Sequence, residues 1–141
     1  MASGRYKPCF IAFTAGVAKK SKLKTEEIAQ KLVAFCRTGD FKGAQQELFA
    51  DDAESIEPVA SPDFDKVTKG KEAIFKKGEK FDEMVDSIHN IEISEPIISS
   101  SSFAILLRMT ANMKNHGETD MKELCVYKVK DGKIISEEFF M

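Results

Sequence analysis

The sequence predicts one α+β domain in which a cone-shaped, antiparallel or mixed sheet curves around three N-terminal helices. Apolar residues recur at helical spacing up to about residue 89 and at a spacing of two from residue 90 onward. The chain has 141 residues, 43% of them hydrophobic and 31% charged, which suits a single core. Because such a sheet is wider at its open end than the helices can fill, we expect an apolar cavity there.

The N-terminal segment differs in charge from the rest of the chain. Residues 1–25 contain six of the 21 basic residues and no acid, so 15 basic and 23 acidic residues remain for the other positions. We therefore predict an arm over residues 1–24 and a domain over residues 25–141. The apolar stretch at 9–18 is short for a secretory signal, so we predict a cytoplasmic protein; export through a signal peptide over residues 1–18 is the alternative.

The composition argues against several function classes. A net charge of −2 gives no general attraction for nucleic acid, and no apolar run approaches the roughly 20 residues of a membrane span. Cys9, Cys36 and Cys125 are odd in number and widely spaced, which predicts buried free thiols rather than disulfides or a zinc site. Because His89 and His116 are the only histidines, we expect no metal and no cofactor.

Three helices are expected before residue 90. The first begins at a cap on Thr25, carries two glutamates in its first turn and stops at Gly39. The second covers about 41–50, and the third covers 71–89. The apolar stripe of the third helix consists of Ile74, Phe75, Gly78, Phe81, Val85 and Ile88. Its predicted solvent side consists of Lys76, Lys77, Glu79, Lys80, Asp82 and Glu83.

Five strands are expected to build the sheet. One covers residues 53–60 and ends near Pro58, and a loop over 61–70 follows it. The dipeptide Asp-Gly at 131–132 predicts a tight hairpin turn between the last two strands. The four strands with alternating patterns lie at residues 91–98, 103–113, 122–130 and 133–141.

Two segments carry a resemblance to a known superfamily. They are "TGDFKGAQQELFADDAESIEPVAS" (38–61) and "KGKEAIFKKG" (69–78), and they resemble the nuclear transport factor two-like superfamily. Within it the pattern is similar to ketosteroid isomerases and SnoaL-type polyketide cyclases, over roughly residues 25–141. The resemblance implies a SnoaL-like domain with a cystatin-like α+β barrel, a cavity for a small hydrophobic ligand, and a homodimer formed through the outer face of the sheet.

The resemblance also implies roles for individual residues. Glu57 precedes Pro58, where the isomerases carry the aspartate that shuttles a proton, and burial in an apolar pocket would make a carboxylate a stronger base. The two oxyanion-hole positions of the isomerases fall on Leu32 and on or beside Cys125, neither of which donates strongly to an enolate. Tyr127, on the same strand face as Cys125, is the candidate substitute donor.

The sequence pattern also predicts positions for three further polar side chains. Glu137 shares a strand face with Ile135 and Phe139, so it is a candidate ligand contact from the last strand. His89 is predicted at the end of the third helix, where a histidine favours the helix dipole, and it is a second candidate. Arg108 is expected on the outer face of its strand, at an interface or in solvent.

Two functions remain open on these grounds. The favoured one is a small-molecule-binding domain with an apolar cavity and no recognisable catalytic set. The alternative is a cofactor-independent isomerase or cyclase that acts on a hydrophobic carbonyl compound with Glu57 as general base. An epoxide hydrolase would need an Asp-Arg-Asp arrangement that has no counterpart in the pattern.

Overall fold

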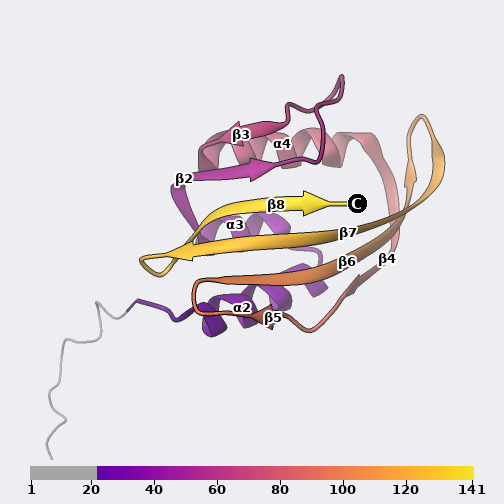
Figure 1. Cartoon of the computed structure of the whole chain (residues 1–141). Coiled ribbons are helices and arrows are strands. Elements are labelled where there is room, and N and C mark those ends of the chain that lie inside the picture. Colours follow the sequence, from indigo (N-terminus) through magenta and orange to yellow (C-terminus); the bar gives the residue numbers. More distant parts are fainter. Residues whose placement is uncertain (1–21) are drawn as a thin grey trace, which may run out of the picture.

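The computed structural model describes residues 22–141 and has the predicted architecture of three helices and a curved mixed sheet (Figure 1). The helices are α2 (Thr25–Arg37), α3 (Phe41–Leu48) and α4 (Lys71–Met84). The strands are β2 (Phe49–Ile56), β3 (Val67–Lys69), β4 (Val85–Ile93), β5 (Ile97–Ile98), β6 (Ser102–Met113), β7 (Gly117–Lys130) and β8 (Lys133–Phe140). Apart from residues 22–24, the predicted N-terminal arm and Cys9 lie outside the described residues.

The sheet joins the two halves of the chain through one parallel pair. Its strand order is β3-β2-β8-β7-β6-β4, and β5 pairs with the edge of β6. All neighbouring strands are antiparallel except β2 and β8, which run side by side in the same direction. In that pair Ser55 lies opposite Glu137, 82 residues later in the chain. The end of β2 is therefore brought next to the C-terminal strand.

The helix starts differ in detail from the prediction. Lys24, not Thr25, is the residue before the first turn of α2, and its backbone N–H donates to the Glu27 carboxylate at 2.8 Å. The Thr25 hydroxyl donates instead to the carbonyl of Ser100 at 2.9 Å, which ties the helix to the β5–β6 connection. Asp40 caps α3 by accepting from the N–H of Gly43 at 2.9 Å.

The predicted end of the third helix was wrong by five residues. α4 ends at Met84, and Val85 begins β4, which pairs with β6 from Val85↔Met113 to Ile93↔Leu107. β-Branched residues in this stretch suit a strand, and pairing with a long neighbour outweighs the helical spacing of its apolar residues. As a consequence His89 lies exposed on β4 and not at a helix end.

The core lies between the helices and the concave face of the sheet. Ile28 and Leu32 of α2 and Phe103 of β6 belong to one buried cluster. The Phe103 ring stacks on Tyr127 with their centroids 4.9 Å apart. Beyond the core, the hairpin turn at 131–132 has positive φ at both residues, 52° and 77°, as the Asp-Gly pair predicted. No helix within residues 22–141 is long and apolar enough to cross a membrane.

Candidate functional site

A pocket of about 550 Å³ lies between α3, α4 and the concave face of the sheet. This volume lies in the range of small-molecule sites, and most of its wall is apolar. The apolar side chains come from both helices, from the loop before β3 and from β6, β7 and β8. They include Phe41, Phe64, Phe75, Phe81, Leu107, Met109, Met121 and Phe139.

One side of the pocket carries a chain of hydrogen-bonded polar groups, which we call the polar network: Ser55, Glu57, Lys77 and Glu137. Lys77 Nζ lies 2.5 Å from Glu57 Oε2 and 2.8 Å from Ser55 Oγ. The Ser55 hydroxyl lies 2.6 Å from Glu137 Oε2. Because an ammonium only donates, Ser55 accepts from Lys77 and directs its own proton to Glu137.

The fold explains how these four side chains meet. The parallel register of β2 and β8 sets Ser55 beside Glu137, and residue 57 follows on the same face because side chains alternate. Lys77 reaches the group from α4, and its Nζ lies 5.4 Å from the centre of the Phe139 ring. Its side chain is only 15% exposed, and that of Glu57 is 24% exposed. The ion pair is therefore largely shielded from solvent.

Glu137 is the most strongly perturbed carboxyl group of the site. The residue is 6% exposed. Burial raises the pKa of Glu137 from 4.5 to about 7; Ser55 and Lys77 oppose the rise, whereas Glu57 and Glu123 add to it. Burial also raises the pKa of Glu123, which lines the same pocket from β7. The pocket thus holds two carboxyls that hold their protons more tightly than usual.

Tyr127 lines the pocket beside this group, with 4% of its surface exposed. Burial raises the pKa of Tyr127 well above 10, so the phenol keeps its proton as a hydrogen-bond donor. Cys36 and Cys125 are buried free thiols, as predicted for these two. Burial raises the pKa of Cys36 to about 12 and that of Cys125 further, so neither is a reactive thiolate.

The structure brings together some of the predicted site residues and separates others. Glu57, Tyr127 and Glu137 all line the pocket. Leu32 and Cys125 are packed in the core, 2% and 0% exposed, and do not line the pocket. The exposed His89 does not line it either, because β4 has replaced the end of the predicted helix.

Lys77 was missed by the sequence prediction, which put it on the solvent side of the third helix. It lines the pocket instead. A signal for this was present, because Lys77 follows Ile74 by three positions and precedes Phe81 by four, so it shares their helix face. The prediction placed Lys77 in solvent because the side chain is charged, although its spacing puts it on the apolar face of the helix.

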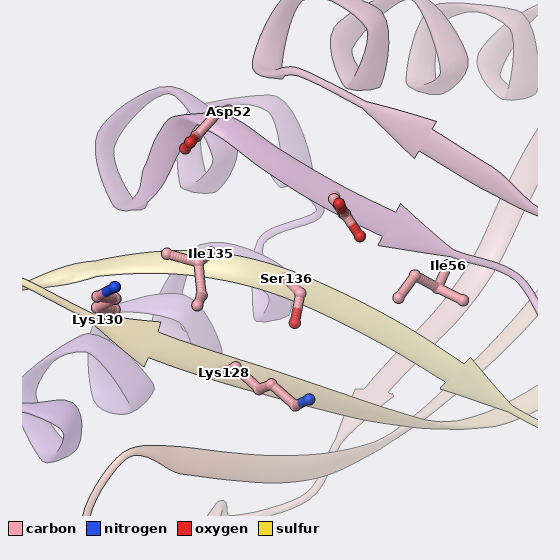
Figure 2. Close-up of a pocket in the computed structure, with 7 residues that line it drawn as sticks. Asp52, Ile56, Lys128, Lys130, Ile135 and Ser136 are labelled. Carbon is pink, nitrogen blue, oxygen red and sulfur yellow. The ribbon is translucent and has the colours of Figure 1, made fainter.

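A second hollow, of about 400 Å³, lies on the opposite face of the sheet (Figure 2). Glu54 and Ser136 are paired next to Ser55 and Glu137, so these lining residues alternate with those of the polar network. Ile135 lines the hollow too, so the prediction that it shares the strand face of Glu137 was wrong; β7 and β8 shift register between Ile134 and Ser136, which interrupts the alternation there. The lining residues come from β2, β7 and β8: Asp52, Glu54, Ile56, Lys128, Lys130, Ile135 and Ser136. Arg108 lies on this outer face too, where it forms a two-pronged ion pair with Asp120 at 2.8 and 3.0 Å.

Comparison with known proteins identifies the family. A family model described as a SnoaL-like domain matches residues 23–141. A proposed SnoaL-like polyketide cyclase from Mesorhizobium loti is 30% identical, with a TM-score of 0.79 over 84% of this chain and 100% of that one.

Two further solved structures share the fold at lower identity. A protein of unknown function with a cystatin-like fold from Xanthomonas campestris is 18% identical, with a TM-score of 0.71 over 84% and 90% of the two chains. A nuclear transport factor two-like protein of unknown function from Burkholderia pseudomallei is 11% identical, with a TM-score of 0.70 over 84% and 92%. No match was found among the curated proteins.

Proposed function

Because the chain belongs to the SnoaL-like domain family, we propose that it binds a small, mostly apolar molecule in the pocket between α3, α4 and the sheet. The observation that carries this proposal is the combination of aromatic walls with one polar side. Apolar walls supply affinity through buried area, and a few polar groups orient the ligand. The polar network and Tyr127 are the groups available for that orientation.

Gly78 supports the proposal from the helix side. It lies inside α4, where a glycine costs about 0.5–1 kcal/mol relative to alanine. A Cβ added at this position would meet nothing within 4 Å, and Gly78 lines the pocket. The absence of a side chain at Gly78 therefore enlarges the pocket. It is not needed for close packing against another helix or strand.

Filling this space is expected to remove ligand binding without unfolding the protein. Gly78→Leu should lower the affinity for an apolar fluorescent probe such as 1-anilinonaphthalene-8-sulfonate by about ten-fold or more, because the added side chain occupies the pocket. Gly78→Ala is the matched control and should keep binding while gaining about 0.5–1 kcal/mol in stability. Equal probe affinity in the two variants would contradict the proposal.

A second candidate function is proton transfer on a carbonyl compound, as in an isomerase or cyclase, with Glu57 as general base. The position of Lys77 favours it. Leu32 and Cys125 cannot stabilise an enolate, but the Lys77 ammonium, 2.5 Å from Glu57, supplies a positive charge within the same pocket. The base and the electrostatic stabiliser would then form one ion pair.

This candidate is tested by hydrogen exchange at carbon. If Glu57 is the base, the protein should speed deuterium uptake at the α-carbon of 2-tetralone, an apolar ketone, as followed by proton NMR. Glu57→Gln should slow the protein-dependent exchange by about 100-fold or more. Unchanged exchange in Glu57→Gln would leave ligand binding as the function.

We also propose that two copies of the domain pair through the outer face of the sheet. Leu106, Leu124 and Phe140 form one row across β6, β7 and β8 in the strand register, and they are 42%, 42% and 44% exposed. A contiguous exposed apolar row is typical of an interface rather than of a surface that stays in water.

The dimer proposal predicts a change of mass in one variant. Light scattering should give about 31 kDa for the natural chain, twice its 15.7 kDa, and close to 15.7 kDa for Leu124→Lys. A lysine there would have to bury its charge in the interface. Thr110→Lys, on the same face but outside the row, is the control and should remain a dimer. A natural chain of 15.7 kDa would rule the dimer out.

A further inference from the structure

The side chains that line the pocket include more acidic than basic groups. Among residues 22–141, six acidic residues and two lysines line it. Both lysines are already engaged: Lys77 lies 2.5 Å from Glu57, and Lys42 lies 3.7 Å from Glu79. Asp40 is used as the cap of α3. The remaining carboxyls have no direct ion-pair partner among the described residues.

Glu137 and Glu123 are the two of these that are shielded from water. They lie on neighbouring strands of the concave face, and β8 pairs with β7 at Tyr127↔Glu137, four residues from Glu123. Because strand residues rise about 3.3 Å each, the two carboxyls lie at different depths of one wall. Each adds negative potential to the same space, and burial raises the pKa of both.

Glu137 also has an oxygen without a hydrogen-bond partner in the part of the chain that the structure describes. Its Oε2 accepts from Ser55, whereas Oε1 has no hydrogen-bond partner within residues 22–141. An ionised carboxylate can accept about four hydrogen bonds. With the residue 6% exposed, the free oxygen costs stability until a donor in the pocket reaches it.

We propose that the ligand of this pocket carries a protonated amine on its apolar body, and that Glu137, with the potential of Glu123, receives it. The inference rests on the proposed binding function and specifies the chemistry of the ligand. An ammonium supplies donors for the free carboxylate oxygen and a direct ion-pair partner, which neither Glu137 nor Glu123 has among residues 22–141. A carboxylate ligand would instead add a further negative charge beside two buried acids.

The aromatic walls fit the same chemistry. Three phenylalanines that line the pocket already have a lysine ammonium near the ring: Lys42 on Phe75, Lys77 on Phe139 and Lys80 on Phe64, at 5.4 to 5.5 Å from the centroids. Ring faces attract cations through their quadrupole. The walls are thus compatible with both the apolar body and the cationic end of such a ligand.

Three probes that share a naphthyl group but differ in charge distinguish a cationic ligand from a neutral or an anionic one. They are 2-(1-naphthyl)ethylamine, 2-(1-naphthyl)ethanol and 1-naphthaleneacetic acid, titrated by calorimetry near pH 8. The amine is expected to bind about ten-fold or more tighter than the alcohol, and the acid weaker than both. If the acid or the alcohol binds at least as tightly as the amine, the inference of a cationic ligand is wrong, but the proposed binding function stands. If none of the three binds, the proposed binding function fails and the inference with it.

Variants of adjacent residues assign the effect to the pocket. Glu137→Gln should lower amine affinity by about ten-fold and leave alcohol affinity within about two-fold, since only the charge is lost. Glu123→Gln should act in the same direction with a smaller effect. Glu138→Gln, whose side chain points to the outer face of β8, is the matched control and should change neither. An equal loss of amine and alcohol binding in Glu137→Gln, with the far-ultraviolet circular dichroism unchanged, would contradict a charge-specific contact.

Discussion

Ionisation of Glu137 is expected to lower the free energy of unfolding by about 3 kcal/mol between about pH 4 and pH 8. The folded protein raises the pKa of this carboxyl from 4.5 to about 7. Between these values the folded state holds a proton that the unfolded chain has released, so stability falls as the pH rises. The loss begins near the unfolded pKa and is complete above the folded one.

The variant Glu137→Gln separates this effect from all other titrations. Glutamine keeps the shape and an acceptor for the Ser55 hydroxyl, but it has no charge to bury. Urea unfolding should find it close to the natural chain near pH 4 and about 3 kcal/mol more stable near pH 8. Glu138→Gln, on the opposite face, is the control and should follow the natural chain at both values. Parallel curves for the natural chain and Glu137→Gln would show that the carboxyl is not buried as described.

A gain in stability on removing a site residue is informative about function. Buried groups whose ionisation opposes folding are retained where they meet a ligand or take part in chemistry. The amine proposed above would reverse the cost, because an ammonium near Glu137 stabilises its ionised form. The pH dependence of stability and the preference among ligands are therefore two independent tests of the buried Glu137 carboxyl.

The fold could be predicted from the sequence because most elements obey one period. β6 alternates between buried and partly exposed residues along nearly its whole length, and α2 has an apolar face at helical spacing. Two errors are small: β3 lies in the stretch predicted as a loop, and β2 begins at Phe49 rather than at residue 53. The largest error lies where two periods overlap. Residues 85–89 fit a helix by spacing, but their partner is β6, and the pairs Val85↔Met113 and Ile88↔Ala111 are 28 and 23 residues apart. Whether these residues form a helix or a strand is decided by their pairing with β6 and not by their local sequence pattern.

The site was predictable in part for a related reason. Glu57 follows from the resemblance. Strand alternation placed Tyr127 correctly, and for Glu137 it was right about Phe139 but wrong about Ile135. Ser55 was not found, since it is defined by the parallel pairing of β2 with β8, which includes a register shift between Phe49 and Glu54. No local pattern contains a contact between strands so far apart in the chain.

Replacing Lys77 is expected to be the most damaging single change to the polar network. Lys77→Met keeps the apolar length of the side chain but leaves Glu57 without its partner and Ser55 without its donor. Breaking a fully buried ion pair costs about 3–5 kcal/mol, and the remaining exposure of Glu57 reduces the expected loss to about 2–3 kcal/mol near pH 8. Urea unfolding measures it.

A second substitution distinguishes a lost ion pair from simple loss of packing. If the damage comes from the orphaned carboxylate, adding Glu57→Gln to Lys77→Met should recover about 1 kcal/mol or more, although Glu57→Gln alone is destabilising. The reason is that glutamine at position 57 carries no charge for the partly buried pocket to accommodate. Additive losses in the double variant would instead mean that Lys77 acts through its methylene stem on the Phe139 ring. In that case the lysine would belong to the apolar wall, and Glu57 would be held by the end of β2 alone.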